Sequence, residues 1–306
     1  MNLALWQSRF KEYLELRNYT PRSVEGYVAQ LRPFFDFLAG AGVDSLGAVT
    51  RDVMEDYRVH LYEHEYRGRR VSIATQTGKL CQIKVFFRFL ERDGFVPLDP
   101  TAGVQLPRQQ RPLPRTVLSE KETERLLEIL EGREPIDIRN RAMLEVFYCT
   151  GIRNSELSAL VLDDVDLRTA ELFVRSGKGR KARKLPLGEE AVAWLREYVD
   201  HARPHFVQAP NETVLFLSLR GGTLRRNTLA MIVRAAARKA GLKKRVTPHV
   251  LRHSCATHML RNGAGLRQLQ ELLGHDSPQT TQRYTRLEVS DLRKVLQRCH
   301  PREKKS

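Results

Sequence analysis

Residues 247–253 read Thr-Pro-His-Val-Leu-Arg-His, and this stretch does most to decide how the second half of the chain folds. It opens a helix that we expect over 248–262. His249 and Arg252 are three residues apart, so they share one face of that helix. Both lie near its first turn, where free N–H groups and the helix dipole favour a bound anion.

Around this helix the sequence predicts a mainly helical unit with a small sheet. Residues 171–175 and 183–187 read as two strands joined by a glycine turn, and 214–217 reads as a further short strand. Ile138 to Cys149 reads as a buried helix. Other helices are expected at 226–240, 266–273, 278–284 and about 288–298.

The first third of the chain reads as helices only. Thr20 followed by Pro21 is an N-cap and first-turn pair, and a later helix is expected from about Ser72 to Arg92. Four short helices around one core fit this stretch. Three prolines and three arginines without periodicity then predict an extended basic linker. The expected domains are residues 1–105, the linker 106–116, and residues 117–306.

The charge favours a polyanionic partner. The 306 residues carry 52 Lys and Arg against 36 Asp and Glu, a net charge of +16. Such an excess favours nucleic acid over an anionic membrane, since no basic amphipathic helix is evident. No apolar run approaches the roughly 18 residues of a membrane span. Without a signal-peptide pattern, a cytoplasmic protein is expected.

Residues 150–157, Thr-Gly-Ile-Arg-Asn-Ser-Glu-Leu, form the second notable motif. Arg153 directly follows a glycine turn and an apolar helix, which places it at a surface or cleft. Glu156 lies one helical turn on and can hold the guanidinium. By itself, the motif is more typical of a capping turn with a surface ion pair.

The turn of the predicted hairpin is unusually basic. Six of the ten residues from 175 to 184 are positive, and none is negative. A single sign of charge favours phosphate contact over an ordinary solvated turn. The candidate DNA-contacting residues are Arg175, Lys178, Arg180, Lys181, Arg183 and Lys184.

Two further residues follow the helix expected at 266–273. His275 comes after the helix-ending Gly274, and Tyr284 lies nine residues later. A metal site is not expected, because position 250 is valine where the H-E-x-x-H pattern needs glutamate. The acidic run 163–166 reads as a solvated loop, and the four cysteines form no C-x-x-C pair.

Together these motifs resemble the tyrosine recombinase (phage integrase) family, most closely its Xer-type members. The stretches T-G-I-R-N-S-E-L, G-K-G-R-K, H-V-L-R-H-S-C-A-T-H-M-L and L-L-G-H-D-S-P-Q-T-T-Q-R-Y-T follow the family's order. The resemblance implies a helical core-binding (SAM-like) domain ahead of a mostly helical catalytic domain with a small sheet. It also implies a catalytic set made up of Arg153, Lys178, His249, Arg252, His275 and the nucleophile Tyr284, with Glu156 in support.

The resemblance implies that the protein cuts and rejoins duplex DNA through a 3′-phosphotyrosyl intermediate, without metal or cofactor. Two arginines suit the anionic phosphoryl group, and a hairpin lysine can protonate the leaving oxygen. Lys178 and Lys181 are close together, so the identity of that lysine stays open. A homo- or hetero-tetramer on paired sites is expected, joined through the C-terminal helix, although this helix could instead pack on its own domain.

Two alternatives remain beside the recombinase. A type IB topoisomerase shares the tyrosine chemistry, but its usual second-arginine motif lacks the histidine found here at position 249. A non-catalytic DNA-binding regulator would leave the arginines and the tyrosine with structural roles only. The sequence leaves open whether the protein serves chromosome-dimer resolution or the integration and excision of a mobile element.

Overall fold

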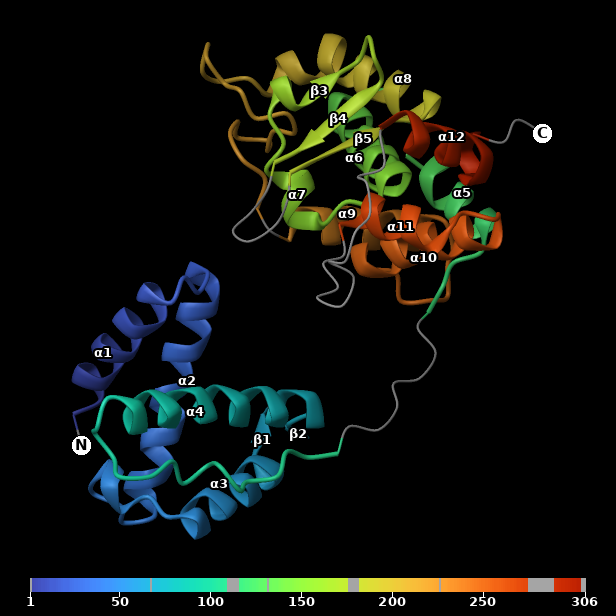
Figure 1. Ribbon diagram of the computed structural model, residues 1–306. Helices are drawn as coiled ribbons and strands as arrows, with labels where there is room; N and C mark the ends of the chain where they lie inside the picture. Colours follow the sequence, from blue (N-terminus) through green and yellow to red (C-terminus); the bar gives the residue numbers. More distant parts are fainter. Residues whose placement is uncertain are drawn as a thin grey trace. The chain divides into compact units, whose positions relative to one another are not determined.

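The computed structural model describes residues 2–66, 68–108, 116–130, 132–175, 182–225, 227–274 and 289–303. Internal contacts divide the chain into two compact units, Met1–Leu113 and Pro114–Ser306. Each unit has a separate hydrophobic core. The mainly α fold is confirmed (Figure 1). Among the described residues, no helix has the length and apolar character to cross a membrane.

Within its described residues, the N-terminal unit contains four α-helices, α1 (Leu3–Leu16), α2 (Pro21–Gly40), α3 (Arg51–Glu63) and α4 (Ile73–Arg92). Thr20, Thr50 and Ser72 each accept a backbone N–H three residues on, which fixes where α2, α3 and α4 begin. Two antiparallel strands of two residues each, β1 (Glu65–Tyr66) and β2 (Arg69–Arg70), lie between α3 and α4 in the chain and were not predicted.

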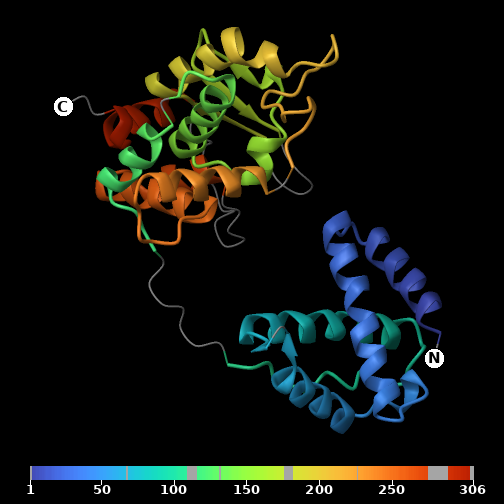
Figure 2. The same ribbon diagram turned by 180° about the vertical axis from the view of Figure 1, so that it is seen from behind.

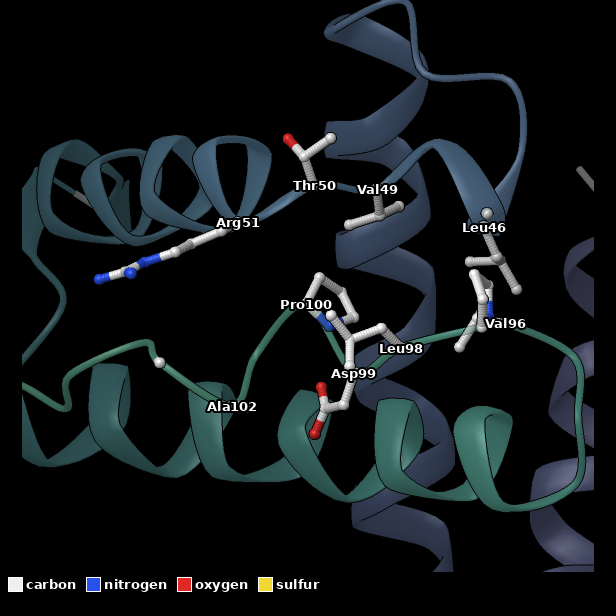
Figure 3. A pocket seen from close by; sticks show the side chains of 12 residues that line it. Leu46, Val49, Thr50, Arg51, Val96, Leu98, Asp99, Pro100 and Ala102 are labelled. Carbon is white, nitrogen blue, oxygen red and sulfur yellow. The ribbon is translucent and has the colours of Figure 1, made fainter.

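A hollow opens in this unit between the start of α3 and the segment after α4 (Figure 3). Its lining is mostly apolar, with the charged side chains of Arg51 and Asp99 at its margin. The Asp99 carboxylate is engaged by the N–H and the hydroxyl of Thr101. Because no histidine, cysteine or tyrosine lines it, the hollow is a poor candidate for a catalytic site.

The C-terminal unit is built around α6 (Pro135–Thr150), in which every residue from 141 to 150 is buried. Beside it lies an antiparallel sheet in the order β3 (Val165–Asp166), β4 (Glu171–Val174) and β5 (Arg183–Pro186) (Figure 1). Figure 2 shows the same ribbon from behind. The surrounding helices are α5 (Glu120–Glu128), α7 (Asn154–Ser158), α8 (Glu189–Glu197), α9 (Thr228–Lys239), α10 (Pro248–Arg261), α11 (Leu266–Leu273) and α12 (Val289–Cys299).

The predicted strand at 214–217 is wrong. Val214 and Leu217 make only isolated bridges, to Val161 and Thr223 respectively. Much of the segment's backbone bonds to side chains instead of a neighbouring strand: the Tyr198 hydroxyl donates to the carbonyl of Leu215 and accepts from the N–H of Leu217. A pattern of apolar residues cannot distinguish this arrangement from a strand.

The C-terminal helix α12 packs on its own domain in the single chain. Leu292, Val295 and Leu296 are at most 4% exposed, and the helix contacts β5, α10 and α11. Arg293 donates to the carbonyl of Thr169 at 2.6 Å. The apolar set therefore completes the core of the unit, whereas the sequence favoured a groove on a neighbouring protomer.

Candidate active site

Arg153 is positioned by the end of α6. Gly151 caps this helix in the left-handed conformation, with φ of +57°. A Cβ at Gly151 would lie 2.7 Å from Cδ2 of Leu273, so the position needs glycine for its backbone angle and for space. The chain then turns at once into α7, and Arg153 stands at the start of that short helix.

Arg252 is carried by α10, which lies beside α11 (Figure 1). The side chain of Thr247 accepts the N–H of Val250 and so caps α10. The Arg252 guanidinium donates to the carbonyl of Gly151 and, at 2.8 Å, to that of Leu273. His249 is exposed at the first turn of the same helix.

Three arginines converge on the C-terminal end of α11. Arg183 donates to the carbonyl of Leu272 at 3.3 Å, Arg252 donates to that of Leu273, and Arg153 donates to that of Gly274. The last carbonyls of a helix lack intrahelical partners and carry the negative end of its dipole. The end of α11 therefore holds three guanidinium groups from three different elements in one place.

Glu156 ties two of these arginines together. Its carboxylate accepts the N–H and the guanidinium of Arg153, at 2.8 and 2.9 Å. It also accepts both terminal nitrogens of Arg183, at 3.2 and 2.9 Å. Burial alone would raise the pKa of Glu156, but the hydrogen bonds from Arg183 and Arg153 lower it to about 2. Glu156 is therefore a carboxylate at any physiological pH.

The cluster has an excess of positive charge. Three guanidinium groups face one carboxylate, and the pKa of Arg252 falls to about 10 because of burial and the nearby Arg153. A guanidinium has five N–H donors, and contacts within the described residues occupy only some of them. An anion with several oxygens, such as a phosphodiester, suits this arrangement.

A buried polar network fixes α10 against α6 behind the arginines. The Tyr148 hydroxyl lies 2.8 Å from Nδ1 of His258, and Nε2 of His258 lies 2.7 Å from the carbonyl of Leu118. Ser254 accepts the N–H of Leu118 at 2.9 Å. The helix that carries Arg252 is thus bonded to the helix that leads to Arg153.

The structure brings together Arg153, Glu156 and Arg252, as the motifs suggested, and adds Arg183. On the same hairpin, Arg175 is exposed and pairs with Asp164, and exposed Lys184 pairs with Glu171. The remaining candidates lie outside the described residues: Lys178, Arg180, Lys181, His275 and Tyr284.

Sequence reasoning missed two features of this region. Arg183 was grouped with the DNA contacts, yet it lies two and four residues before Leu185 and Leu187, which face the core. This period of two would have indicated that its side chain points inward. Asp164 was assigned to a solvated loop, but it is 3% exposed and accepts the N–H of Val161 as well as Arg175.

Comparisons with known proteins show the family to which the chain belongs. Residues 116–290 match the Phage integrase family, and residues 6–94 match the phage integrase N-terminal SAM-like domain. The chain belongs to the phage integrase family of tyrosine recombinases. It is therefore a DNA breaking-and-rejoining enzyme, and the resemblance drawn from its motifs is confirmed.

Curated relatives match the recombinase over nearly its whole length. The chain is 39% identical to the tyrosine recombinase XerC of Halalkalibacterium halodurans over 97% of both chains. It is 40% identical to the tyrosine recombinase XerD of Pseudomonas aeruginosa over 91% of both. These similarities support a site-specific recombinase and favour neither the topoisomerase nor the regulator.

Solved structures share the fold. The XerA recombinase is 33% identical with a TM-score of 0.50, covering 96% of this chain and 97% of its own. A lambda integrase (75–356) dimer bound to a COC′ core site is 18% identical with a TM-score of 0.69, covering 94% and 100%. At the latter identity the likeness concerns the fold alone.

Proposed function

We propose that the recombinase is an Xer-type strand exchanger that cuts duplex DNA through a bond between Tyr284 and a 3′-phosphate. The supporting observation is the convergence of Arg153 and Arg252 on the end of α11. The chain continues from this end directly into the segment that carries His275 and Tyr284. The arginines proposed to bind the phosphate therefore meet at the point where the segment with the proposed nucleophile begins.

In the proposed reaction, the phenolic oxygen of Tyr284 attacks the scissile phosphorus while the bond from phosphorus to the 5′-oxygen breaks. A phenol, with a pKa of roughly 10, needs its proton removed or its anion stabilised, and His249 and His275 are assigned that task. Lys178 gives a proton to the leaving oxygen. Attack by a 5′-hydroxyl on the phosphotyrosine reverses the step.

The arginines stabilise the charge that develops on the phosphoryl oxygens. Glu156 supports Arg153, as its two contacts with that residue indicate. The covalent ester conserves the energy of the broken bond, so neither nucleotide nor metal is needed. The exposed basic residues of the hairpin, Arg175 and Lys184, are assigned to DNA phosphates.

We further propose that the recombinase works as a homo- or hetero-tetramer on paired sites. A lambda integrase tetramer bound to a Holliday junction shares the fold. If α12 joins the protomers, it must be exchanged, so that its contacts with β5 and α10 are made by a neighbour's helix. The N-terminal domain is assigned to DNA clamping.

A nicked suicide substrate tests the chemistry. The parent protein should become attached to a 3′-phosphate and leave a free 5′-hydroxyl, in excess EDTA and without nucleotide. Tyr284→Phe should bind DNA equally well and form no adduct. Adduct formation by this variant, attachment to the 5′ end, or loss of adduct on chelation would each contradict the mechanism.

The same substrate with a 5′-sulfur leaving group separates the two lysines. A thiolate leaves without a proton, so this substrate should restore cleavage by Lys178→Ala. Rescue of Lys181→Ala alone would move the general acid to that residue. The two variants are matched controls for each other, since each removes one positive charge from the same hairpin turn.

A further inference from the structure

Arg183 begins β5, and its side chain points away from solvent. It is 13% exposed, whereas the side chain of the next residue, Lys184, is 58% exposed. Successive side chains of a strand point to opposite faces, so the two residues have different surroundings. Arg183 shares its face with Leu185, which is fully buried.

The guanidinium of Arg183 fills the space between Glu156 and the end of α11. Both terminal nitrogens meet the Glu156 carboxylate, and Nε meets the carbonyl of Leu272. A Cβ at Gly274 would lie 2.9 Å from Cζ of Arg183, so the backbone there is closely covered by this group. Three of the five Arg183 donors are thus used inside the protein.

These contacts couple Arg183 to both of the other arginines. The paired contact fixes the rotation of the Glu156 carboxylate, which leaves one oxygen aligned with the Arg153 guanidinium. The contact with Leu272 holds the turn of α11 whose next two carbonyls receive Arg252 and Arg153. Without Arg183, the Glu156 carboxylate could rotate and the last turn of α11 would lose the contact at Leu272.

We propose that Arg183 is a positioning residue for the phosphate-binding arginines and makes no DNA contact of its own. It holds Glu156 and the α11 terminus so that Arg153 and Arg252 present their remaining donors to the scissile phosphate. This inference rests on the roles proposed above for Arg153 and Arg252. It moves Arg183 from the set of DNA contacts into the support of the catalytic site.

The test compares Arg183→Ala, Arg183→Lys and Arg153→Ala in the full-length protein. DNA affinity is measured over a range of salt concentrations, and single-turnover cleavage of a suicide substrate is measured at saturating protein. Arg196→Ala, which removes an exposed arginine from α8, is the charge-matched control. Thermal melting establishes that each variant is folded at the assay temperature.

Arg183→Ala should keep the parent's affinity within about twofold and keep the slope of log affinity against log salt. Its cleavage rate should fall at least about tenfold, because the lost contacts act on the transition state and not on binding. Arg183→Lys should fall in between, since an ammonium keeps the charge but cannot bridge a carboxylate and a carbonyl as a fork does. A defect that is only structural would lower the melting temperature and leave the rate of the folded, saturated protein unchanged.

Two results would overturn the inference. A salt slope reduced by about 0.9 together with weaker binding would make Arg183 a direct phosphate contact. An unchanged cleavage rate in folded Arg183→Ala would remove the positioning role. If Arg153→Ala also cleaved normally, the proposed function would fail as well; if Arg153→Ala lost cleavage, the proposed function would stand without Arg183.

Discussion

Replacing Glu156 with glutamine should destabilise the catalytic unit strongly at neutral pH. The carboxylate accepts four hydrogen bonds from Arg153 and Arg183, and its side chain is 11% exposed. The pKa falls from 4.5 to about 2, which corresponds to about 3 kcal/mol of stability because each tenfold change in acidity is worth about 1.4 kcal/mol. Breaking a buried ion pair from one side gives a similar figure, about 3 to 5 kcal/mol.

Urea and thermal unfolding of the parent and of Glu156→Gln measure this difference. The expected loss lowers the melting temperature by about 6 to 12 °C, at about 2 to 4 °C per kcal/mol for a unit of this size. Because the folded-state pKa is depressed, the contribution is complete above about pH 4.5 and is lost as pH falls towards 2. The difference should shrink to about 2 kcal/mol at pH 3.5.

Two results would refute this reasoning. A difference below about 1 kcal/mol at pH 7 would mean that the carboxylate behaves like an exposed surface pair. A large difference that did not change between pH 7 and pH 3.5 would mean that the glutamine amide disturbs the packing, and that the charge contributes little. In either case Glu156 could not be the group that holds the two arginines.

Three further outcomes are expected. Arg153→Ala and Arg252→Ala should each lower the cleavage rate on the order of 100-fold or more and lower DNA affinity much less. A variant whose cleavage rate and affinity fell by the same factor would contradict the proposed roles. Truncation after Glu288 should lower the melting temperature, because α12 is part of the core of its own unit; an unchanged melting curve would show that the helix is dispensable for the monomer. Burial lowers the pKa of His300 to about 4, so the contribution of His300 to stability is complete above about pH 6.5 and is lost as pH falls towards 4. This contribution should fall by about 2 kcal/mol between pH 7 and pH 5, and the stability of His300→Asn should therefore fall less than that of the parent over this range.

The helices were predictable because their signals are local. Thr20, Ser72 and Thr247 each stand directly before the helix that their side chains cap, and the structure has α2, α4 and α10 where those residues predict them. The hairpin of β4 and β5 followed from two short runs around a glycine turn. Such signals need no knowledge of the rest of the chain.

The contacts between distant segments were not predictable in the same way. Arg183 lies 27 residues after Glu156, and no local pattern states that the two meet. The partner of α12 could not be decided from the sequence for a related reason. Its apolar stripe of Leu292, Val295 and Leu296 has the same spacing whether the groove belongs to its own domain or to a neighbour.

The convergence of three arginines on α11 has a consequence for how DNA is held. The carbonyls of Leu272, Leu273 and Gly274 carry partial charges, equivalent to about half an elementary charge at a helix end. A phosphodiester carries a full negative charge, so it can bind the remaining N–H donors of the arginines while their bonds to the helix carbonyls stay in place. If Arg153 and Arg252 bind the scissile phosphate as proposed, these carbonyls hold both side chains in place before DNA binds, which lowers the cost of ordering them on binding. The same bonds fix the end of α11 at Gly274, ten residues before Tyr284 in the sequence, so under the proposed function a displaced α11 would disturb the phosphate and the nucleophile together.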